Sequence, residues 1–396
     1  MKSSDLRGAV RLATDATRGL TDLVEAVHGG IAQVPSFSPP STDGRTGGIS
    51  GLVYRSVRGV TRVVGGSIDA LLGLLAPALA ADDGSPERAA VIAALNGVLG
   101  DHLAATANPL ATAMSLRLAG AAPGPDWPAG AVAAPQVGPR LLVLVHGLCM
   151  NDLQWRRDGH DHGAALAHDL GFTPLYLRYS SGLHVSTNGR ELATQLESLL
   201  ERWPVPIERV VLLCHSMGGL VARSALHQAQ RSGLRWPGRV DDLVFLGTPH
   251  HGAPLERAGN LVGTVLGATP YAAPFARLAR LRSAGITDLR HGHLLDGDES
   301  GQDRFAPGPD HRTPVPLPES VRCFAVAACL AGERAGTVKR LLGDGLVGVD
   351  SALGRHADPA RCLQFASGRT LLLFDTGHMR LLSHPEVYAQ LLRWLG

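Results

Sequence analysis

Beyond residue 140, the apolar residues gather in short runs that alternate with helical patterns. Near-continuous apolar strands separated by helices are typical of a parallel sheet that is covered on both faces. The pattern therefore predicts an α/β domain over residues 140–396. Its expected strands are Leu141–Val145, Pro174–Leu177, Val210–Leu213, Leu243–Leu246, Val321–Ala327 and Leu371–Phe374.

Helices are predicted to begin near Asn188, Met217 and His384, between or after these strands. Asn188 and Glu191 have the spacing of a capping box, in which two side chains satisfy backbone N–H groups at a helix start. From residue 270 to 318 the alternation is interrupted by many Arg, His, Pro and Gly residues. A loop of that length is usually a lid or a binding element, so we expect a lid-like insertion over about 259–318.

The first 120 residues have a different pattern, with apolar positions every three or four residues. Helical stretches are predicted over 6–27, 53–75 and 86–105. We expect residues 1–120 to form an N-terminal helical unit that braces the main domain, in preference to an independent binding module. A membrane-surface helix is disfavoured because its charges are of mixed sign. Residues 121–139, rich in Ala, Pro and Gly, are the predicted linker.

Composition narrows the classes of partner. Apolar residues make up 45% of the 396 residues, which is typical of a globular chain. The 37 Lys and Arg residues nearly cancel the 35 Asp and Glu residues, so we expect no nucleic-acid partner. The longest apolar stretch, residues 70–81, is shorter than the roughly 20 residues of a spanning helix, and it contains Pro77. No transmembrane segment is predicted.

The five cysteines are odd in number, and no C-x-x-C pair occurs. We therefore expect free thiols, no cysteine-based metal site and a reducing compartment. Arg7, Arg11 and Arg18 interrupt the first apolar residues, so no secretory signal is predicted and the cytoplasm is the expected location. The histidines at 160, 162 and 168 lack a recognisable ligand spacing, and no metal or other cofactor is expected.

The segment with the clearest chemistry runs from Val210 to Val221, where an apolar strand leads through Ser216 into a helical pattern. This is the context of a nucleophile elbow, a turn so tight that residues two before and two after the serine must be small. Gly218 meets the second requirement, and Cys214 stands where glycine is usual. Ser216 could instead be only a helix N-cap. The order of strand, turn and helix favours the nucleophile.

A second strand ends in His146-Gly147-Leu148. In a fold with such an elbow, the loop after this strand supplies one N–H of the oxyanion hole, and the residue after the nucleophile supplies the other. Leu148 and Met217 are the predicted donors. We expect His146 to order this loop.

The general base is predicted to be His378, just past the last apolar strand and before a final helix. The base must follow the nucleophile and the acid along the chain. His384 is the nearest alternative, but the Pro-Glu that follows it suits a helix start.

Taken together, these motifs resemble bacterial α/β-hydrolases of the lipase and esterase type, and the related GPI inositol-deacylase-like group. The resemblance covers about residues 140–396. The motifs that carry it are His146-Gly147, Cys214-His215-Ser216-Met217-Gly218-Gly219, Gly247-Thr248-Pro249-His250-His251-Gly252, Asp344-Gly345-Leu346-Val347 and Gly377-His378. It implies the α/β-hydrolase fold, with mostly parallel strands and helices on both faces.

Three residues compete for the catalytic acid. Asp375 lies only three residues before His378, at the end of the same strand. Its carboxylate would have difficulty reaching the side of the imidazole that faces away from Ser216. Asp350 precedes Ser-Ala-Leu and is predicted to be a helix N-cap. Asp344 lies between two glycines that let the backbone turn sharply, and its D-G-x-V segment resembles the one that carries the acid in related lipases. We expect Asp344 to be the acid.

The resemblance implies a serine hydrolase that cleaves a small-molecule carboxylic ester or a lipid through an acyl-enzyme. An acyltransferase or a thioesterase would use the same residues. A protein of another class, a non-catalytic lipid- or granule-binding scaffold, would keep the fold with a broken triad.

Overall fold

The computed structural model describes residues 7–8, 11, 85–118, 137–253, 283–299, 310–333 and 343–396. Its contacts divide the chain into two compact units, and the larger one comprises Ala89–Ala104 and Ala111–Gly396. Everything below concerns this larger unit. The helix predicted over 53–75, nearly all of that over 6–27, and most of the predicted linker lie outside the described residues.

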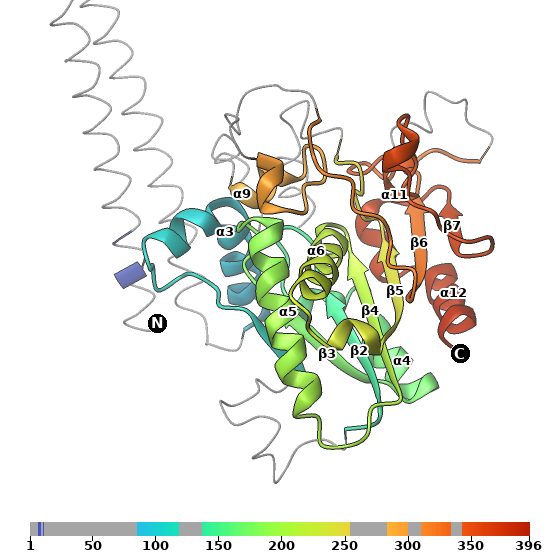
Figure 1. Cartoon of the computed structure of the whole chain (residues 1–396), viewed down its shortest axis with the longest axis horizontal. Helices are drawn as coiled ribbons and strands as arrows, with labels where there is room; N and C mark the ends of the chain where they lie inside the picture. The colour runs from blue at the N-terminus through green and yellow to red at the C-terminus, as the bar shows by residue number, and fades with distance from the viewer. Residues whose placement is uncertain are drawn as a thin grey trace, which may run out of the picture. The chain divides into compact units, whose positions relative to one another are not determined.

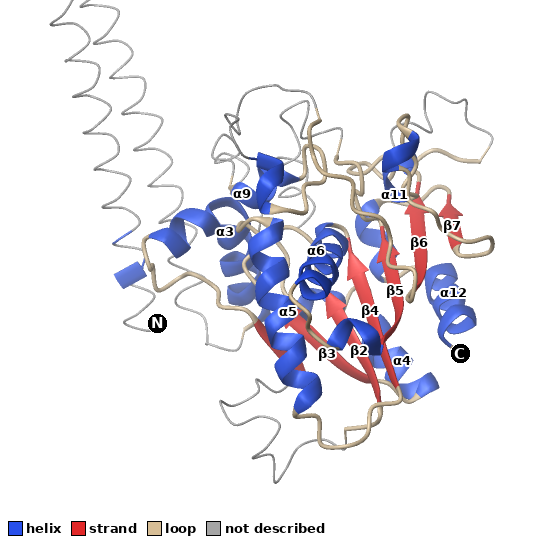
Figure 2. Cartoon of the chain, viewed as in Figure 1, coloured by secondary structure: helices blue, strands red, loops and turns tan. Residues whose placement is uncertain are grey.

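A seven-stranded sheet forms the centre of the larger unit (Figures 1 and 2). Its spatial order is β1-β3-β2-β4-β5-β6-β7, and every neighbouring pair is parallel except β1 with β3. All six predicted strands are present. The strands are β1 (Ser115–Leu118), β2 (Arg140–Val145), β3 (Thr173–Arg178), β4 (Arg209–His215), β5 (Val240–Leu246), β6 (Arg322–Ala328) and β7 (Thr370–Leu373).

The strand β1 lies outside the predicted domain boundary. It pairs antiparallel with β3, with Ser115 opposite Arg178, and it alternates buried and half-buried positions as an edge strand does. Helix α3 (Pro86–Ala105) occupies the predicted range, but most of it belongs to the same unit as the sheet. The compact unit that contains the sheet therefore begins before residue 140, the predicted start of the α/β domain.

Helices cover both faces of the sheet (Figure 1). On one face lie α5 (Val185–Glu201) and α6 (Met217–Arg231), which pack against each other. On the other face, α4 (His162–Leu170) and α12 (Pro385–Leu395) enclose a cluster of buried side chains with alternate residues of β2 and β4. Side chains that alternate along a strand reach both layers, which is why the strands are apolar throughout.

Helix α5 begins earlier than predicted. Its first residue is Val185, and His184 is its N-cap without a side-chain capping bond. Asn188 lies inside the first turn, where its side-chain amide donates to the carbonyl of Ser180 at 3.0 Å. The predicted capping box is therefore wrong, because the amide is used by the preceding loop. The other two predicted starts are confirmed, α6 at Met217 and α12 directly after His384.

Short helical turns complete the unit. Two of them, α9 and η4, fall within the predicted insertion, of which residues 259–282 and 300–309 lie outside the described residues. The turns are η1 (Asp152–Trp155), η2 (Trp236–Arg239), α9 (Ala284–Asp288), η4 (Asp296–Glu299), α11 (Val349–Ala352), η5 (Pro359–Arg361) and η6 (His378–Leu382).

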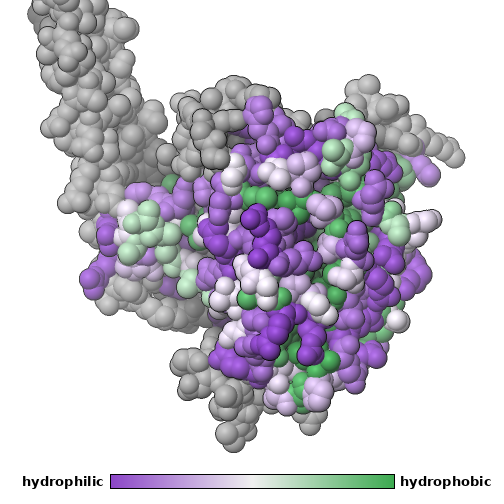
Figure 3. All heavy atoms as spheres, in the orientation of Figure 1, coloured by the Kyte–Doolittle hydropathy of each residue, from purple (hydrophilic) through white to green (hydrophobic). Residues whose placement is uncertain are grey.

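The visible face of the unit carries mostly hydrophilic residues, with apolar residues between them (Figure 3). No helix among the described residues is long and apolar enough to cross a membrane. All five cysteines are free, and four of them are buried.

Candidate active site

Four loops that carry the predicted site residues follow β2, β4, β6 and β7, so they meet at the carboxyl edge of one parallel sheet. This edge is where open α/β sheets bind ligands. The sheet therefore brings together residues that are more than 200 positions apart in the chain.

Ser216 lies in the turn between β4 and α6 with a left-handed backbone, φ 55° and ψ −128°. A non-glycine residue in such a conformation costs on the order of 1–3 kcal/mol and persists only where its surroundings hold it. Its N–H donates to the carbonyl of Leu246 at 2.9 Å, and its carbonyl accepts from the N–H of Gly219 at 3.0 Å. The Ser216 side chain makes no capping bond, which argues against a simple N-cap role.

Small residues let this turn approach β2. A Cβ on Gly218 would lie 2.3 Å from the carbonyl oxygen of Val145, so only glycine fits there. Cys214 is fully buried, and that burial raises the pKa of its thiol, so it remains a small protonated core residue. Cysteine is accommodated at the position where glycine is usual.

The side chains of His378 and Asp344 are paired and buried. Nδ1 of His378 lies 2.7 Å from Oδ2 of Asp344, and the His378 backbone N–H donates to the Asp344 carbonyl at 3.0 Å. The other carboxylate oxygen accepts from the N–H groups of Leu346 and Val347 at 3.0 and 2.8 Å. The Asp344 carboxylate accepts a hydrogen bond from the Nδ1–H of His378, and in that tautomer Nε2 is the acceptor nitrogen of the ring.

The other two acid candidates lie elsewhere. Asp350 is exposed, lies in the first turn of α11 and pairs with Arg355 at 3.5 Å; the N-cap of that helix is Gly348. Asp375 is exposed with a φ of 51°. Of the three carboxylates, all of which lie in the described part of the chain, Asp344 is the one that contacts the His378 ring.

His215, to which the sequence assigned no role, connects the elbow to the base. Its ring lies 4.7 Å from that of His378 between centroids, and its Nε2 lies 3.4 Å from the His378 carbonyl. Burial, followed by the neighbouring His378, holds the pKa of His215 well below its usual range. A neutral His215 therefore lies behind His378. Its place directly before Ser216 in the elbow motif is the sequence signal that could have drawn attention to it.

The loop after β2 lies against the elbow, since a Cβ on Gly147 would be 2.9 Å from the Ser216 Cβ. Leu148 and Met217 are buried, and within the described part of the chain neither N–H has an acceptor. His146 orders this loop: it stacks on Tyr179 at 4.3 Å between centroids, and Tyr179 donates to the His146 carbonyl at 2.8 Å. Burial lowers the pKa of His146 to about 4.

Other histidines have structural contacts. His162 is buried and its Nε2 lies 3.0 Å from the Leu381 carbonyl, while Nδ1 of His251 lies 2.7 Å from the Arg312 guanidinium. Among the described residues, no group of three or more His, Cys, Asp or Glu could hold a metal ion.

The strand order and the strained serine turn define the α/β-hydrolase fold, which the sequence predicted. Residues 138–266, about a third of the chain, match the family model described as a PGAP1-like alpha/beta domain. This match confirms the resemblance drawn from the motifs. No curated protein matches the chain in sequence.

Several solved structures are similar to the chain. The mature lipase BlEst2 of Bacillus licheniformis is 19% identical with a TM-score of 0.42, over 67% of this chain and 95% of that one. A metagenomic carboxyl esterase, MGS0156, is 17% identical with a TM-score of 0.39, over 82% and 98%. An esterase of Pyrococcus furiosus is 15% identical with a TM-score of 0.37, over 65% and 83%.

Proposed function

We propose that this protein is a serine hydrolase that cleaves carboxylic esters through an acyl-enzyme on Ser216. The observation that carries the proposal is the strained turn at Ser216 beside the buried His378–Asp344 pair. A strained serine, a neutral imidazole and a buried carboxylate at one sheet edge are the parts of an activated nucleophile.

In the proposed reaction, Ser216 Oγ attacks the ester carbonyl carbon while His378 Nε2 takes the hydroxyl proton. The carbonyl electron pair moves onto oxygen, and the N–H groups of Leu148 and Met217 stabilise the resulting oxyanion. Collapse of this intermediate breaks the bond to the alcohol, which leaves with the proton from His378. Water then repeats the sequence and releases the acid.

The surroundings of His378 suit this proton transfer. Asp344 stabilises the imidazolium that forms, and its own charge is held by two backbone N–H groups. Because burial keeps His215 neutral, this ring adds no positive charge beside the imidazolium. The substrate is proposed to be a small-molecule ester or a lipid, with no metal or organic cofactor. A cytoplasmic location stays a prediction from the five free cysteines.

A fluorophosphonate probe tests the nucleophile, because it reacts only with an activated hydroxyl. We expect wild-type protein to be labelled on the peptide that contains Ser216, and Ser216→Ala to remain unlabelled. A series of p-nitrophenyl esters of increasing acyl length then measures the size of the acyl pocket. Wild-type protein that neither labels nor hydrolyses any ester would instead favour the non-catalytic scaffold.

The acyltransferase and thioesterase alternatives keep the same acyl-enzyme. They differ in the group that carries or accepts the acyl chain, so the labelling result is the same for all three. Product analysis with an oxoester, a thioester and an added alcohol acceptor separates them. We expect free acid from the oxoester as the main product.

A further inference from the structure

The loop after β2 contains a second strained residue, Cys149, which follows the proposed oxyanion donor Leu148. Cys149 has a φ of 58° and is buried. A side chain in this conformation costs on the order of 1–3 kcal/mol, so the contacts around it must hold it in place. Two distant segments of the chain contact Cys149, and a third segment joins those two.

The first contact comes from the loop after β3. The backbone N–H of Cys149 donates to Oγ of Ser181 at 2.9 Å, and Ser181 is 1% exposed. That N–H belongs to the peptide that joins Leu148 to Cys149. The bond therefore fixes the peptide next to the Leu148 N–H, which must point at the oxyanion.

The second contact comes from α3, whose backbone packs directly against the loop. A Cβ on Gly97 would lie 2.3 Å from the Cys149 sulfur and 2.9 Å from its Cα. A Cβ on Gly182 would lie 2.1 Å from the Asn96 carbonyl oxygen. Glycines on both sides thus let α3 lie against Cys149 and against the loop that carries Ser181.

The third segment is α9 with its N-cap Ser283, which joins α3 to the Ser181 loop. The hydroxyl of Ser283 donates to the Gly97 carbonyl at 2.6 Å, and the N–H of Gly285 donates to the Gly182 carbonyl at 3.1 Å. A Cβ on Gly285 would lie 2.1 Å from the Ser181 carbonyl oxygen. The Ser181 loop is therefore enclosed between α3 and α9.

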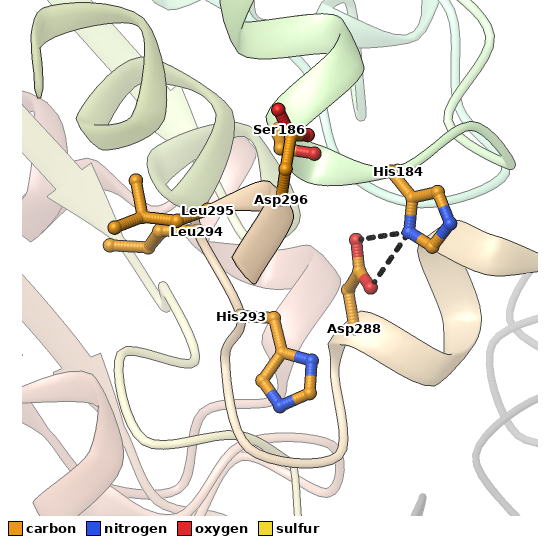
Figure 4. Close-up of a pocket in the computed structure, with 7 residues that line it drawn as sticks. All are labelled: His184, Ser186, Asp288, His293, Leu294, Leu295 and Asp296. Carbon is orange, nitrogen blue, oxygen red and sulfur yellow. Dashed lines mark hydrogen bonds and ion pairs between the residues drawn. The ribbon is translucent and has the colours of Figure 1, made fainter. Parts of the chain in front are cut away.

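Asp288, the last residue of α9, fastens that helix to the start of α5. Its carboxylate accepts from the N–H of Val185 at 2.7 Å and lies 3.2 Å from Nδ1 of His184. Figure 4 shows this pair at the wall of a small pocket of about 80 Å³. Because Asp288 is buried, this end of α9 is held in one position.

We propose that Ser181, held between α3 and α9, is a positioning residue for the oxyanion hole. By accepting the Cys149 N–H it keeps the strained turn in place, and with it the direction of the Leu148 N–H. An oxyanion donor works only when it is aimed before the reaction starts, and a displacement of about 1 Å can cost on the order of 100-fold in rate. This inference rests on the proposed serine hydrolase function.

The test compares Ser181→Ala with Ser181→Thr and with Ser180→Ala as the matched control. Ser180 is the buried neighbour, and its hydroxyl has no partner among the described residues. The readouts are kcat and KM on a short p-nitrophenyl ester, inhibition by an alkyl trifluoromethyl ketone, and the melting temperature. The ketone adduct on Ser216 places an oxyanion in the hole.

We expect Ser181→Ala to lower kcat roughly 10- to 100-fold with KM unchanged, and to weaken ketone inhibition by a similar factor. Ser181→Thr, which keeps the hydroxyl, should recover most of both losses, and Ser180→Ala should resemble wild type. A lower melting temperature with unchanged kcat and ketone inhibition would overturn the proposal. Ester hydrolysis retained by Ser216→Ala would instead overturn the proposed function.

A second variant keeps the proposal testable if Ser181→Ala does not fold. Gly97→Ala pushes a methyl group toward Cys149 from the other side and should lower kcat while the Ser181 hydroxyl is intact. The control is Gly238→Ala, because a Cβ there would meet nothing within 4 Å. Equal kcat in folded Gly97→Ala and Gly238→Ala would contradict the role of α3 in the support.

Discussion

Ser216 and Cys149 have similar positive φ angles, 55° and 58°, yet the chain supports them in different ways. Ser216 lies between the strand and helix that adjoin it; its carbonyl accepts from the nearby Gly219, and its N–H donates to Leu246 on the neighbouring strand. Cys149 is supported by Ser181 and Gly97, which are 32 and 52 residues away. One strained site is held by the regular strand and helix that adjoin it and by the neighbouring strand, and the other is held by loops and a helix from distant parts of the chain.

This difference separates the residue that is proposed to react, Ser216, from the packing that is proposed to aim the oxyanion donor Leu148. The residue order around Ser216 is visible in a short stretch of sequence, whereas the aim of the Leu148 N–H depends on packing between α3, α9 and the Ser181 loop. Substitutions at the elbow should therefore remove the reaction itself. Substitutions around Cys149 should lower kcat only partly.

The largest effect is expected for Ser216→Ala. Loss of the hydroxyl removes the nucleophile, so turnover should fall on the order of a million-fold while the fold is kept. The measurement is kcat on a p-nitrophenyl ester together with a thermal melt. Ser232→Ala, at an exposed position after α6, is the control and should match wild type. Fluorophosphonate labelling that survives Ser216→Ala would show that the nucleophile lies elsewhere.

A smaller loss is expected for Asp344→Asn, because an amide cannot stabilise the imidazolium and favours the wrong tautomer of His378. Turnover should fall by about four orders of magnitude with the fold intact. Asp350→Asn and Asp375→Asn are the controls, since both carboxylates are exposed. Near-normal turnover in Asp344→Asn beside a crippled Asp350→Asn would move the acid to Asp350.

Gly218→Ala tests how closely the elbow must approach β2. The added Cβ would lie 2.3 Å from the Val145 carbonyl oxygen, and a backbone atom in the sheet cannot move aside. We expect the free energy of unfolding to fall by about 1–3 kcal/mol, measured by urea denaturation. Gly238→Ala is the open-site control. Wild-type stability in Gly218→Ala would contradict the close contact between Gly218 and the Val145 carbonyl.

The smallest effect concerns pH. Burial lowers the pKa of His146 to about 4, whereas an unfolded histidine titrates near its usual value of about 6.5. Between these values the unfolded chain binds the proton and the folded one does not, so stability falls as the pH falls from about 6.5 toward 4. The slope is at most about 1.4 kcal/mol per pH unit for each such group.

Urea unfolding at several pH values measures this slope. His146→Phe keeps a ring against Tyr179 and removes one titrating group, so its slope should be shallower than that of wild type. The control is His168→Gln, which replaces a histidine whose side chain is 88% exposed. An unchanged slope in His146→Phe would contradict the lowered pKa of His146.

The sequence by itself determined the six parallel strands, the range of α3 and the starts of α6 and α12. It also located the turn at Ser216. These features depend on residues close together in the chain: apolar runs, helical spacing, and small residues beside a serine. Strand β1 was not predicted, because a strand of four residues with only two buried positions is too short to show a clear alternation of apolar and polar residues.

Only the tertiary structure decided which distant groups meet. It placed the Asp344 carboxylate 2.7 Å from Nδ1 of His378 and set the His215 ring 4.7 Å from the His378 ring between centroids. It also turned the Asn188 side chain toward the loop before α5, where the sequence predicts a cap. It also set Ser181 and α3 against Cys149. Side-chain contacts between segments far apart in the chain leave no local periodicity. They therefore cannot be predicted from the pattern of residues along a single sequence.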